Sequence, residues 1–376
     1  MSRTKDNNNM ELSAGLKKVY TAEQQSAGEA QRYAQIIAWG PMVFQTARIM
    51  VKWGILELIN QAANGITHEE ICQETGLSDY AVKCLLEASL SIGIIVVDPE
   101  TDRFSITKAG WFLLNDQSTR VNLDMNHDVN YQGMFYLDES LKQGRPVGLK
   151  TLGDWPTLYE GLSVLPQQVK ESWLNFDHFY SDESFEEALK IVFDEYQVKR
   201  LYDVGGNTGK WALQCVGYST DAEVTVLDLP QQIRMMQENT AGKQGAERIK
   251  GFPINFLDEQ AAFPKQEGLD AIWMSQFLDC FSMEQIVSIL KRAQAAMTAD
   301  TRIFIMETLW DRQRFDTAAL CLTMTSLYFT AMANGNSKMY NTRDLEQCIR
   351  EAGLEIEQLY DHLGLGHTII VAKKAE

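Results

Sequence analysis

The chain has 376 residues, 45% of them hydrophobic, and a formal net charge of −17 at pH 7. This length suits two or three folded domains, and the acidic balance argues against a function that depends on neutralising a nucleic-acid backbone. The six cysteines form no Cys-x-x-Cys pair and have no histidine at ligand spacing, so we expect reduced thiols, a cytoplasmic location and no metal site. No leader and no apolar stretch of about 18 residues is visible, so we expect no membrane partner.

Residues 1–20 are polar and predict a disordered tail, and residues 21–110 read as a mainly helical domain. The expected elements are helices at 22–39 and 41–61, short helices at 67–76 and 78–91, and a hairpin at 94–106. The last three elements together predict a winged helix. The helical spacing of the first two helices places seven apolar residues on buried faces: Ile36, Ile37, Val43, Ala47, Met50, Leu56 and Ile59. These helices look too apolar for an isolated monomer, which predicts a homodimer.

A winged helix raises the hypothesis of DNA binding. A helix that reads the major groove normally presents basic and amide side chains. The second short helix instead carries Lys83 between Asp79 and Glu87, and it contains no arginine. We therefore favour packing or dimerisation as its role and expect no nucleic-acid partner.

The rest of the chain divides into a helical bridge at 111–184, rich in aromatic residues and methionine, and an α/β domain at 185–376. Strand and helix patterns alternate in this domain, which predicts a mostly parallel, doubly wound sheet. The expected parallel strands lie at 200–204, 223–228, 249–257, 269–275 and 301–307. The segments 354–359 and 368–373 are joined by a short glycine-rich turn, which predicts an antiparallel hairpin at the sheet edge.

The segment Leu201-Tyr-Asp-Val-Gly-Gly-Asn-Thr-Gly-Lys-Trp211 carries the clearest signal of chemistry. An apolar run ends in Asp203 and a glycine cluster and then resumes, which predicts a strand, a tight turn and the first turn of a helix. Such a turn lets a cofactor approach the backbone and the helix N-terminus. Asp228 closes the next strand, where a carboxylate can accept both hydroxyls of a ribose.

The spacing of this segment separates the candidate cofactors. The dinucleotide pattern G-x-G-x-x-G fails from Gly205 and from Gly206, and the phosphate-binding P-loop fails because Trp211 follows the Gly-Lys pair. The acid-x-G-x-G-x-G pattern of class I S-adenosylmethionine (SAM) methyltransferases is similar, with Asn207 in place of the middle glycine. Asparagine tolerates left-handed backbone, so this substitution is mild.

At this point the chain resembles the plant and bacterial small-molecule O-methyltransferases, the group that includes caffeate and acetylserotonin methyltransferases. The resemblance rests on the order of the winged helix, Phe176-Asp-His-Phe-Tyr180, Asp203-Val-Gly-Gly, Asp228-Leu-Pro, Asp258 six residues before Pro264, and Asp270-Ala-Ile-Trp-Met274. It implies a Rossmann-like methyltransferase domain behind an N-terminal dimerisation domain. It also implies SAM as cofactor, S-adenosylhomocysteine (SAH) as product, and methyl transfer to oxygen of a small aromatic or conjugated acceptor.

The resemblance implies a set of cofactor-binding residues, with Asp228 at the ribose and Asp258 beside the adenine. The full set is Asp203, Gly205, Gly206, Asn207, Gly209, Asp228, Leu229, Asp258, Glu259 and Ser275. It also places the acceptor beside Phe176, Tyr180, Met324 and Tyr328. At their helical spacing, Met324 and Tyr328 fit a core stripe as well as a pocket wall.

The chain departs from the family where the chemistry is expected. The family's catalytic segment resembles V-L-H-D-W-S-D-E, and the matching run here is Phe277-Leu-Asp-Cys-Phe-Ser-Met-Glu284. Asp279 therefore replaces the general-base histidine, and Glu307 matches the glutamate that orients it. Met339 stands where the family has a second glutamate.

Three interpretations of Asp279 remain open. Asp279 could act as a general base, although a free aspartate with a pKa of about 3.9 is weak toward a phenol with a pKa of about 10. The site could instead work by alignment alone on an acceptor that ionises by itself, or the protein could bind SAM without transferring a methyl group. His178 is the best substitute base, because its segment resembles the one that lines the acceptor pocket. The sequence leaves open whether oxygen, nitrogen or carbon is methylated.

Overall fold

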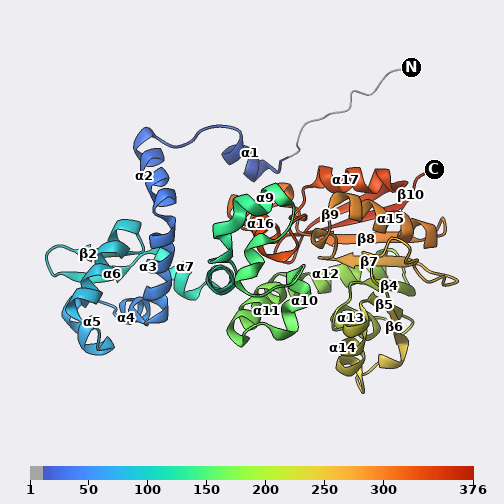
Figure 1. Cartoon of the computed structure of the whole chain (residues 1–376), viewed down its shortest axis with the longest axis horizontal. Coiled ribbons are helices and arrows are strands. Elements are labelled where there is room, and N and C mark those ends of the chain that lie inside the picture. Colours follow the sequence, from blue (N-terminus) through green and yellow to red (C-terminus); the bar gives the residue numbers. More distant parts are fainter. Residues whose placement is uncertain (1–11) are drawn as a thin grey trace. The chain divides into compact units, whose positions relative to one another are not determined.

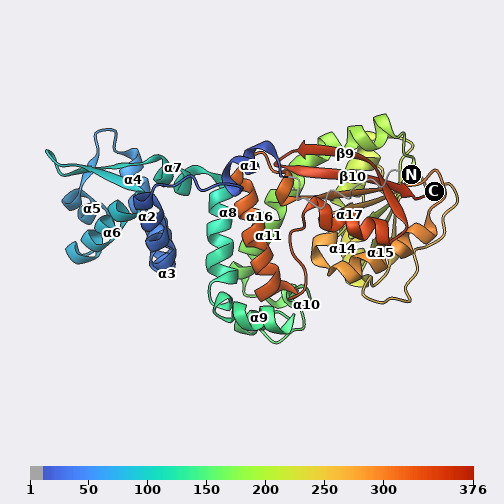
Figure 2. The same cartoon turned by 90° about the horizontal axis from the view of Figure 1, so that it is seen from above.

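The computed structural model describes residues 12–376, without the side chains of residues 163, 178 and 180–182. The chain forms two compact units. We call residues 23–129 and 167–176 the helical unit, and residues 12–22, 130–166 and 177–376 the sheet unit. Figures 1 and 2 show the elements of each unit from two directions.

The helical unit begins with three helices, α2 (Ala27–Ala38), α3 (Gly40–Lys52) and α4 (Ile55–Gln61). Gly54 has φ +72°, a left-handed conformation that separates α3 from α4, so the single helix predicted over 41–61 is two. Next come α5 (His68–Thr75), α6 (Asp79–Ile92), β2 (Ile95–Asp98) and β3 (Arg103–Ile106), in the order expected for a winged helix. The two-residue β1 (Ile66–Thr67) completes a sheet of order β1-β3-β2.

The first helices expose apolar side chains that the sequence pattern assigned to buried faces. Met50, Leu56 and Ile59 are buried as predicted, but α2 has no buried residue, and Ile37 is 63% exposed. Trp39 and Met42 are also exposed. The helices therefore form where the apolar spacing predicts them. The helical unit itself does not cover the apolar face of α2.

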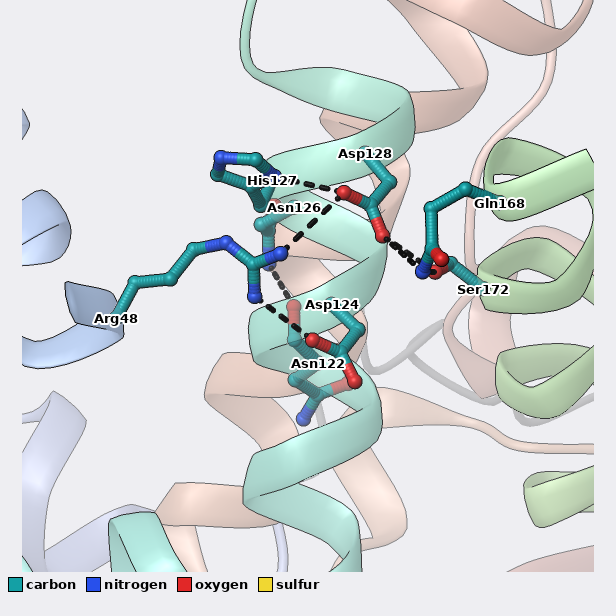
Figure 3. A network of polar contacts seen from close by, with 8 residues as sticks. All are labelled: Arg48, Asn122, Asp124, Asn126, His127, Asp128, Gln168 and Ser172. Carbon is teal, nitrogen blue, oxygen red and sulfur yellow. Dashed lines mark hydrogen bonds and ion pairs between the residues drawn. The ribbon is translucent and has the colours of Figure 1, made fainter. Parts of the chain in front are cut away.

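A polar network fixes three elements of the helical unit to one another (Figure 3). It centres on Asp128 in the π-helical turn η1 (Asn126–Asn130), which follows α7 (Lys108–Asn115) and α8 (Gln117–Met125). Asp128 accepts hydrogen bonds from Ser172 at 2.6 Å and Gln168 at 3.1 Å on α11 (Gln167–Ser181), and it pairs with His127 at 2.7 Å and Arg48 at 3.5 Å. These contacts explain why residues 167–176 belong to this unit.

The sheet unit is built on seven strands in the order β6-β5-β4-β7-β8-β10-β9 (Figure 1). The strands are β4 (Arg200–Val204), β5 (Glu223–Asp228), β6 (Ile249–Pro253), β7 (Ala271–Ser275), β8 (Arg302–Glu307), β9 (Leu354–Leu363) and β10 (His367–Lys374). β4 to β8 are parallel, whereas β10 runs antiparallel to β8 and β9. The predicted α/β sheet and its antiparallel C-terminal hairpin are confirmed.

Side chains alternate between two hydrophobic layers on the faces of this sheet, as strand geometry requires. Tyr202, Ile272 and Ile305 pack with α15 (Met283–Ala296) and α17 (Thr342–Glu351). Leu201 and Trp273 pack on the other face with α12 (Phe185–Leu189), α13 (Lys210–Tyr218) and α14 (Pro230–Thr240). With both faces covered, the functional groups of the sheet lie at the ends of its strands.

The predicted bridge over 111–184 is shared between the two units and is not a domain of its own. In the sheet unit it contributes η2 (Gly133–Tyr136), α9 (Leu137–Gln143), η3 (Val147–Thr151), α10 (Leu158–Gly161) and η4 (Leu162–Val164). The predicted disordered tail also needs correction, because residues 14–20 form helix α1 (Ala14–Tyr20). Its Leu16 is fully buried, and Ser13 donates a hydrogen bond to the Gln313 carbonyl at 2.6 Å.

Two further segments complete the sheet unit near its catalytic region. The 3₁₀ turn η8 (Leu278–Cys280) follows β7, and α16 (Asp316–Tyr328) continues into the π-helical η10 (Phe329–Ala333). The long helix expected around Met324 and Met332 thus changes form after Tyr328. Across residues 12–376, no helix is long and apolar enough to cross a bilayer.

Candidate active site

Acidic side chains gather at the carboxyl ends of the parallel strands. Asp203 lies in β4, Asp228 ends β5, and Glu307 ends β8, while Ser275 ends β7. Because β4 to β8 run in parallel, these residues share one edge of the sheet. The sequence predicted their positions on separate strands, and the strand order brings them together.

The turn after β4 has the geometry that its glycines predict. Gly205 has φ +71° and Gly209 has φ +74°, and both conformations are strained for any residue with a side chain. A Cβ atom at Gly205 would lie 2.4 Å from the Phe277 ring. Asn207 has φ +48°, so it adopts the left-handed backbone expected where the pattern calls for glycine.

Asp228 organises this turn through its two carboxylate oxygens. One oxygen accepts the Asn207 amide at 2.9 Å, and the other accepts the Leu229 amide at 2.7 Å. Burial raises the pKa of Asp228, and the two amides oppose that rise. Gln232 donates to the Asn207 side chain at 3.3 Å and so supports the turn from α14.

Asp203 carries an oxygen that has no hydrogen-bond partner among the described residues. The side chain is 2% exposed, and its Oδ2 atom is the unpaired one. Burial, reinforced by Asp228, raises the pKa of Asp203 to about 8. A Cβ atom at Gly206 would lie 2.4 Å from Oδ2, so only glycine leaves this space free. An open backbone turn beside an unsatisfied buried carboxyl fits the ammonium end of SAM.

The predicted adenine residues lie on the loop after β6. Asp258 and Glu259 are exposed, and Asp258 Oδ1 accepts the Gln260 amide at 3.0 Å. Arg292 fixes this loop by donating to the carbonyls of Phe256, Asp258 and Ala261 at 2.7–3.0 Å. No sequence motif identified Arg292, and an adenine role for the two acids stays a prediction.

The position predicted to replace the family's histidine lies in a buried, acidic environment. Asp279 is 7% exposed and Glu307 is 3% exposed. Glu307 Oε1 accepts the amides of Phe277 at 3.1 Å and Leu278 at 2.9 Å, which fixes the glutamate to the turn that carries Asp279. Burial raises the pKa of Asp279 to about 7, with a contribution from the negative charge of Asp177. Burial and Asp279 together raise the pKa of Glu307 well above its usual range.

Cys280, which the sequence places beside Asp279, and two residues that the sequence did not single out complete this environment. The Tyr159 hydroxyl donates to Cys280 Sγ at 3.3 Å, and the Cys280 thiol in turn points to Asp279 Oδ1 at 3.5 Å. Asn334 donates to the Cys280 carbonyl at 2.7 Å, which anchors the turn to the end of η10. Tyr159 lies in the predicted bridge, more than a hundred residues before its partner, so no local pattern could identify it.

The residues predicted to lie beside the methyl acceptor differ in where the structure places them. Tyr328 is buried, and its phenol contributes to the electrostatic field at Tyr159, whereas Met324 is 52% exposed. Phe176 belongs to the helical unit. The side chains of His178 and Tyr180 lie outside the described part of the chain. Within that part, no group of three or more His, Cys, Asp or Glu side chains could hold a metal ion.

Two family profiles match separate parts of the chain. The Dimerisation2-like domain matches residues 31–104, which lie in the helical unit. The O-methyltransferase domain matches residues 180–355, which include the glycine turn and all the acidic strand ends. The two matches occur in the order that the sequence resemblance implies.

Individual proteins with the same organisation are similar over nearly the whole chain. The L-tyrosine C(3)-methyltransferase of Streptomyces lavendulae is 22% identical over 355 residues, covering 92% of this chain and 94% of that protein. The crystal structure of the SAM-dependent methyltransferase SibL has a TM-score of 0.67 and 22% identity, covering 91% of this chain and 98% of that one. The O-methyltransferase NcsB1 from neocarzinostatin biosynthesis, crystallised with SAM and 2-hydroxy-5-methyl naphthoic acid, has a TM-score of 0.61 and 19% identity, covering 88% of this chain and 95% of that one.

The glycine turn, the free Asp203 oxygen, the strand-end acids and the profile matches lead to one conclusion. The chain belongs to the SAM-dependent O-methyltransferase family, with a Rossmann-like catalytic domain and an N-terminal dimerisation domain.

Proposed function

We propose that this protein methylates a small aromatic or conjugated acceptor and that Asp279 replaces the family's histidine as the base. The observation that carries the proposal is the burial of Asp279 beside Glu307 at the strand edge that also carries the glycine turn. When bound, SAM supplies a methyl group on a positively charged sulfur. The residues of this chain orient the acceptor and remove its proton.

The cofactor roles follow from the contacts of the glycine turn. Asp203 Oδ2 would receive the ammonium group, and the backbone at Gly205, Gly206 and Gly209 would lie against the amino-acid portion. Asp228 would hold the ribose while it keeps the Asn207 and Leu229 amides in place. Asp258, Glu259 and Ser275 are proposed to surround the adenine.

Asp279 is a better base in this environment than a free aspartate would be. A carboxylate with a pKa near 4 would hold a phenolic proton poorly, whereas burial raises the pKa of Asp279 to about 7. A base with a pKa near the working pH combines a usable ionised fraction with a useful affinity for the proton. The hydroxyl proton would move to the Asp279 carboxylate, and the oxygen would take the methyl group that SAM supplies, with the carbon–sulfur electron pair staying on sulfur in the product SAH.

The same deprotonation would serve oxygen or carbon methylation. A phenolate places negative charge on oxygen and on the ring carbons ortho and para to the C–O carbon, so acceptor orientation selects the atom. The family profile favours oxygen, whereas the Streptomyces lavendulae relative is named for transfer to carbon. We propose oxygen as the methylated atom, with the adjacent ring carbon as the alternative.

We also propose that the protein is a cytoplasmic homodimer formed through its N-terminal domain. The exposed apolar side chains of α2 and α3 provide a surface for a second copy, and they fall inside the residues that match the Dimerisation2-like domain. Lys83, the lysine of the candidate recognition helix, is paired with Asp79 at 3.0 Å, which supports a role other than DNA binding.

Calorimetric titration with SAM and SAH, followed by a screen of phenols for methyl transfer, tests the proposal. We expect micromolar cofactor binding and labelled product with at least one phenol, and mass spectrometry of that product identifies the methylated atom. Binding without transfer to any member of a broad panel would favour a SAM-binding protein that does not methylate. Failure of the folded protein to bind either ligand would overturn the cofactor assignment.

A further inference from the structure

The acidic region around Asp279 has a surplus of hydrogen-bond acceptors. Glu307 Oε1 accepts two backbone amides, but its Oε2 atom is fully buried and has no hydrogen-bond partner among the described residues. Asp279 Oδ1 has only the weak thiol donor of Cys280, at 3.5 Å. Two buried carboxyl groups are therefore left with unused acceptor positions.

The protein supplies no described cation to this region. Asp279 and Glu307 contact backbone amides and a thiol, and no described Lys, Arg or His pairs with either carboxyl. Asp177 adds negative charge from the sheet-unit end of α11. Burial raises the pKa of both carboxyls, and positive charge from a bound molecule would stabilise their ionised forms.

The hydroxyl of the acceptor cannot supply both the missing hydrogen-bond donors and the positive charge. A phenol brings one hydrogen-bond donor, which Asp279 uses when it removes the proton. Glu307 Oε2 would then remain unsatisfied, and the loss of the phenolic proton would bring no positive charge. A protonated amine brings three donors and a full positive charge.

We propose that the acceptor is an aromatic amine-bearing molecule, bound as a cation whose ammonium group is held by Glu307 while its ring hydroxyl faces Asp279 and the methyl donor. This inference rests on the proposed function and names its substrate class. It predicts an order of affinity in which cationic acceptors bind most tightly, neutral acceptors less tightly and anionic acceptors least tightly. The orphaned Glu307 oxygen carries the argument, because it is buried and aimed at no other group of the described protein.

Binding of matched probes to the protein saturated with SAH tests this order without requiring turnover. Tyramine, 4-ethylphenol and 3-(4-hydroxyphenyl)propanoate share one ring and differ in the charge of the side chain. Serotonin and 5-hydroxyindole-3-acetate give the same comparison on a larger ring. We expect the ammonium probe of at least one ring to bind at least about tenfold more tightly than its uncharged or anionic partner, as for charge-assisted hydrogen bonds in a buried site.

Variants locate the preference at the two acids. Glu307→Gln and Asp279→Asn should reduce the preference to about twofold or less, whereas Asp221→Asn removes the same charge at an exposed position and should leave it unchanged. Equal or tighter binding of the neutral probes, or no binding of any ammonium probe at millimolar concentration, would overturn the inference. Asp279→Asn could instead weaken the binding of SAM but not of SAH, and leave the order of probe affinities unchanged. The acids would then stabilise the positively charged sulfur of SAM, and the inference would also be wrong.

These results are distinguishable from failure of the proposed function. If methyl transfer occurs but the ammonium probes do not bind most tightly, only the proposal of an ammonium-bearing acceptor is rejected. Absence of SAM binding rejects the methyltransferase assignment itself, and with it the inference.

Discussion

The catalytic domain contains two acid pairs that differ in how their hydrogen bonds are satisfied. Asp228 of the first pair has an amide on each oxygen, and its partner Asp203 faces a turn kept open by glycine. In the second pair, Glu307 has amides on one oxygen only, and Asp279 has a thiol. The first pair is built by one short segment and the next strand, whereas the second depends on side chains from distant parts of the chain. We therefore propose the first pair as a cofactor site that many sequences can share, and the second pair as the place where the chemistry of this protein differs.

The largest expected effect concerns Asp228. Asp228→Ala removes the proposed ribose acceptor and the anchor of the Asn207 and Leu229 amides. We expect calorimetry to show SAM affinity reduced at least about 100-fold, or about 2.7 kcal/mol. Asp221→Ala, at an exposed position, is the charge-matched control. Unchanged affinity in a folded Asp228→Ala protein would contradict the assignment of the first pair.

A glycine substitution tests whether the turn after β4 requires a residue without a side chain. Gly205→Ala places a Cβ atom 2.4 Å from the Phe277 ring at a φ of +71°. We expect a loss of about 2 kcal/mol in the free energy of unfolding, measured with denaturant. Gly217→Ala, in α13 with no atom within 4 Å of the new Cβ, should be neutral or slightly stabilising. Equal effects of the two substitutions would show that the turn does not require glycine.

The catalytic role of Asp279 predicts a pH dependence. Burial raises the pKa of Asp279 to about 7, so the ionised base and the single-turnover rate should both increase as the pH rises through about 7. Asp279→Asn should lower the rate at pH 8 at least about tenfold and remove this rise. A variant that kept the wild-type rate and profile would show that alignment alone drives the reaction.

The smallest expected effect concerns the stability contributed by Asp203. Burial raises the pKa of Asp203 to about 8, above its unfolded value of 3.8, so the native protein retains a proton that the unfolded chain has lost. The stabilisation is complete below pH 3.8 and is lost as the pH rises through about 8. Between pH 7 and 8, the wild type should lose about 1 kcal/mol relative to Asp203→Asn. Parallel pH profiles of unfolding for the two proteins would contradict a raised pKa.

The sequence predicted the glycine turn and its flanking strands because they depend on local backbone geometry. Asp203, the glycines and Asp228 follow one another within about one strand-helix-strand unit, and the parallel sheet then brings them together. Asn207 adopts the left-handed backbone that the glycine pattern required. Periodicity likewise predicted the C-terminal hairpin.

The remaining features depend on contacts that a local pattern does not encode. Tyr159 and Asn334 reach the catalytic turn from remote segments, so the sequence alone did not identify them. Ile37 has the spacing of a buried residue but is exposed, because helical periodicity does not say which surface covers a face. The sequence also left the role of Asp279 open, since its base strength depends on its burial.

Single-turnover transfer from methyl-labelled SAM tests the central claim most directly. Wild-type protein in excess over SAM is mixed with a phenolic acceptor at pH 8, and mass spectrometry follows SAH and the labelled acceptor. We expect both products to form together in equal amounts, and we expect Asp279→Asn to slow their formation. Bound SAM that stays intact with every acceptor of the panel would contradict the central claim.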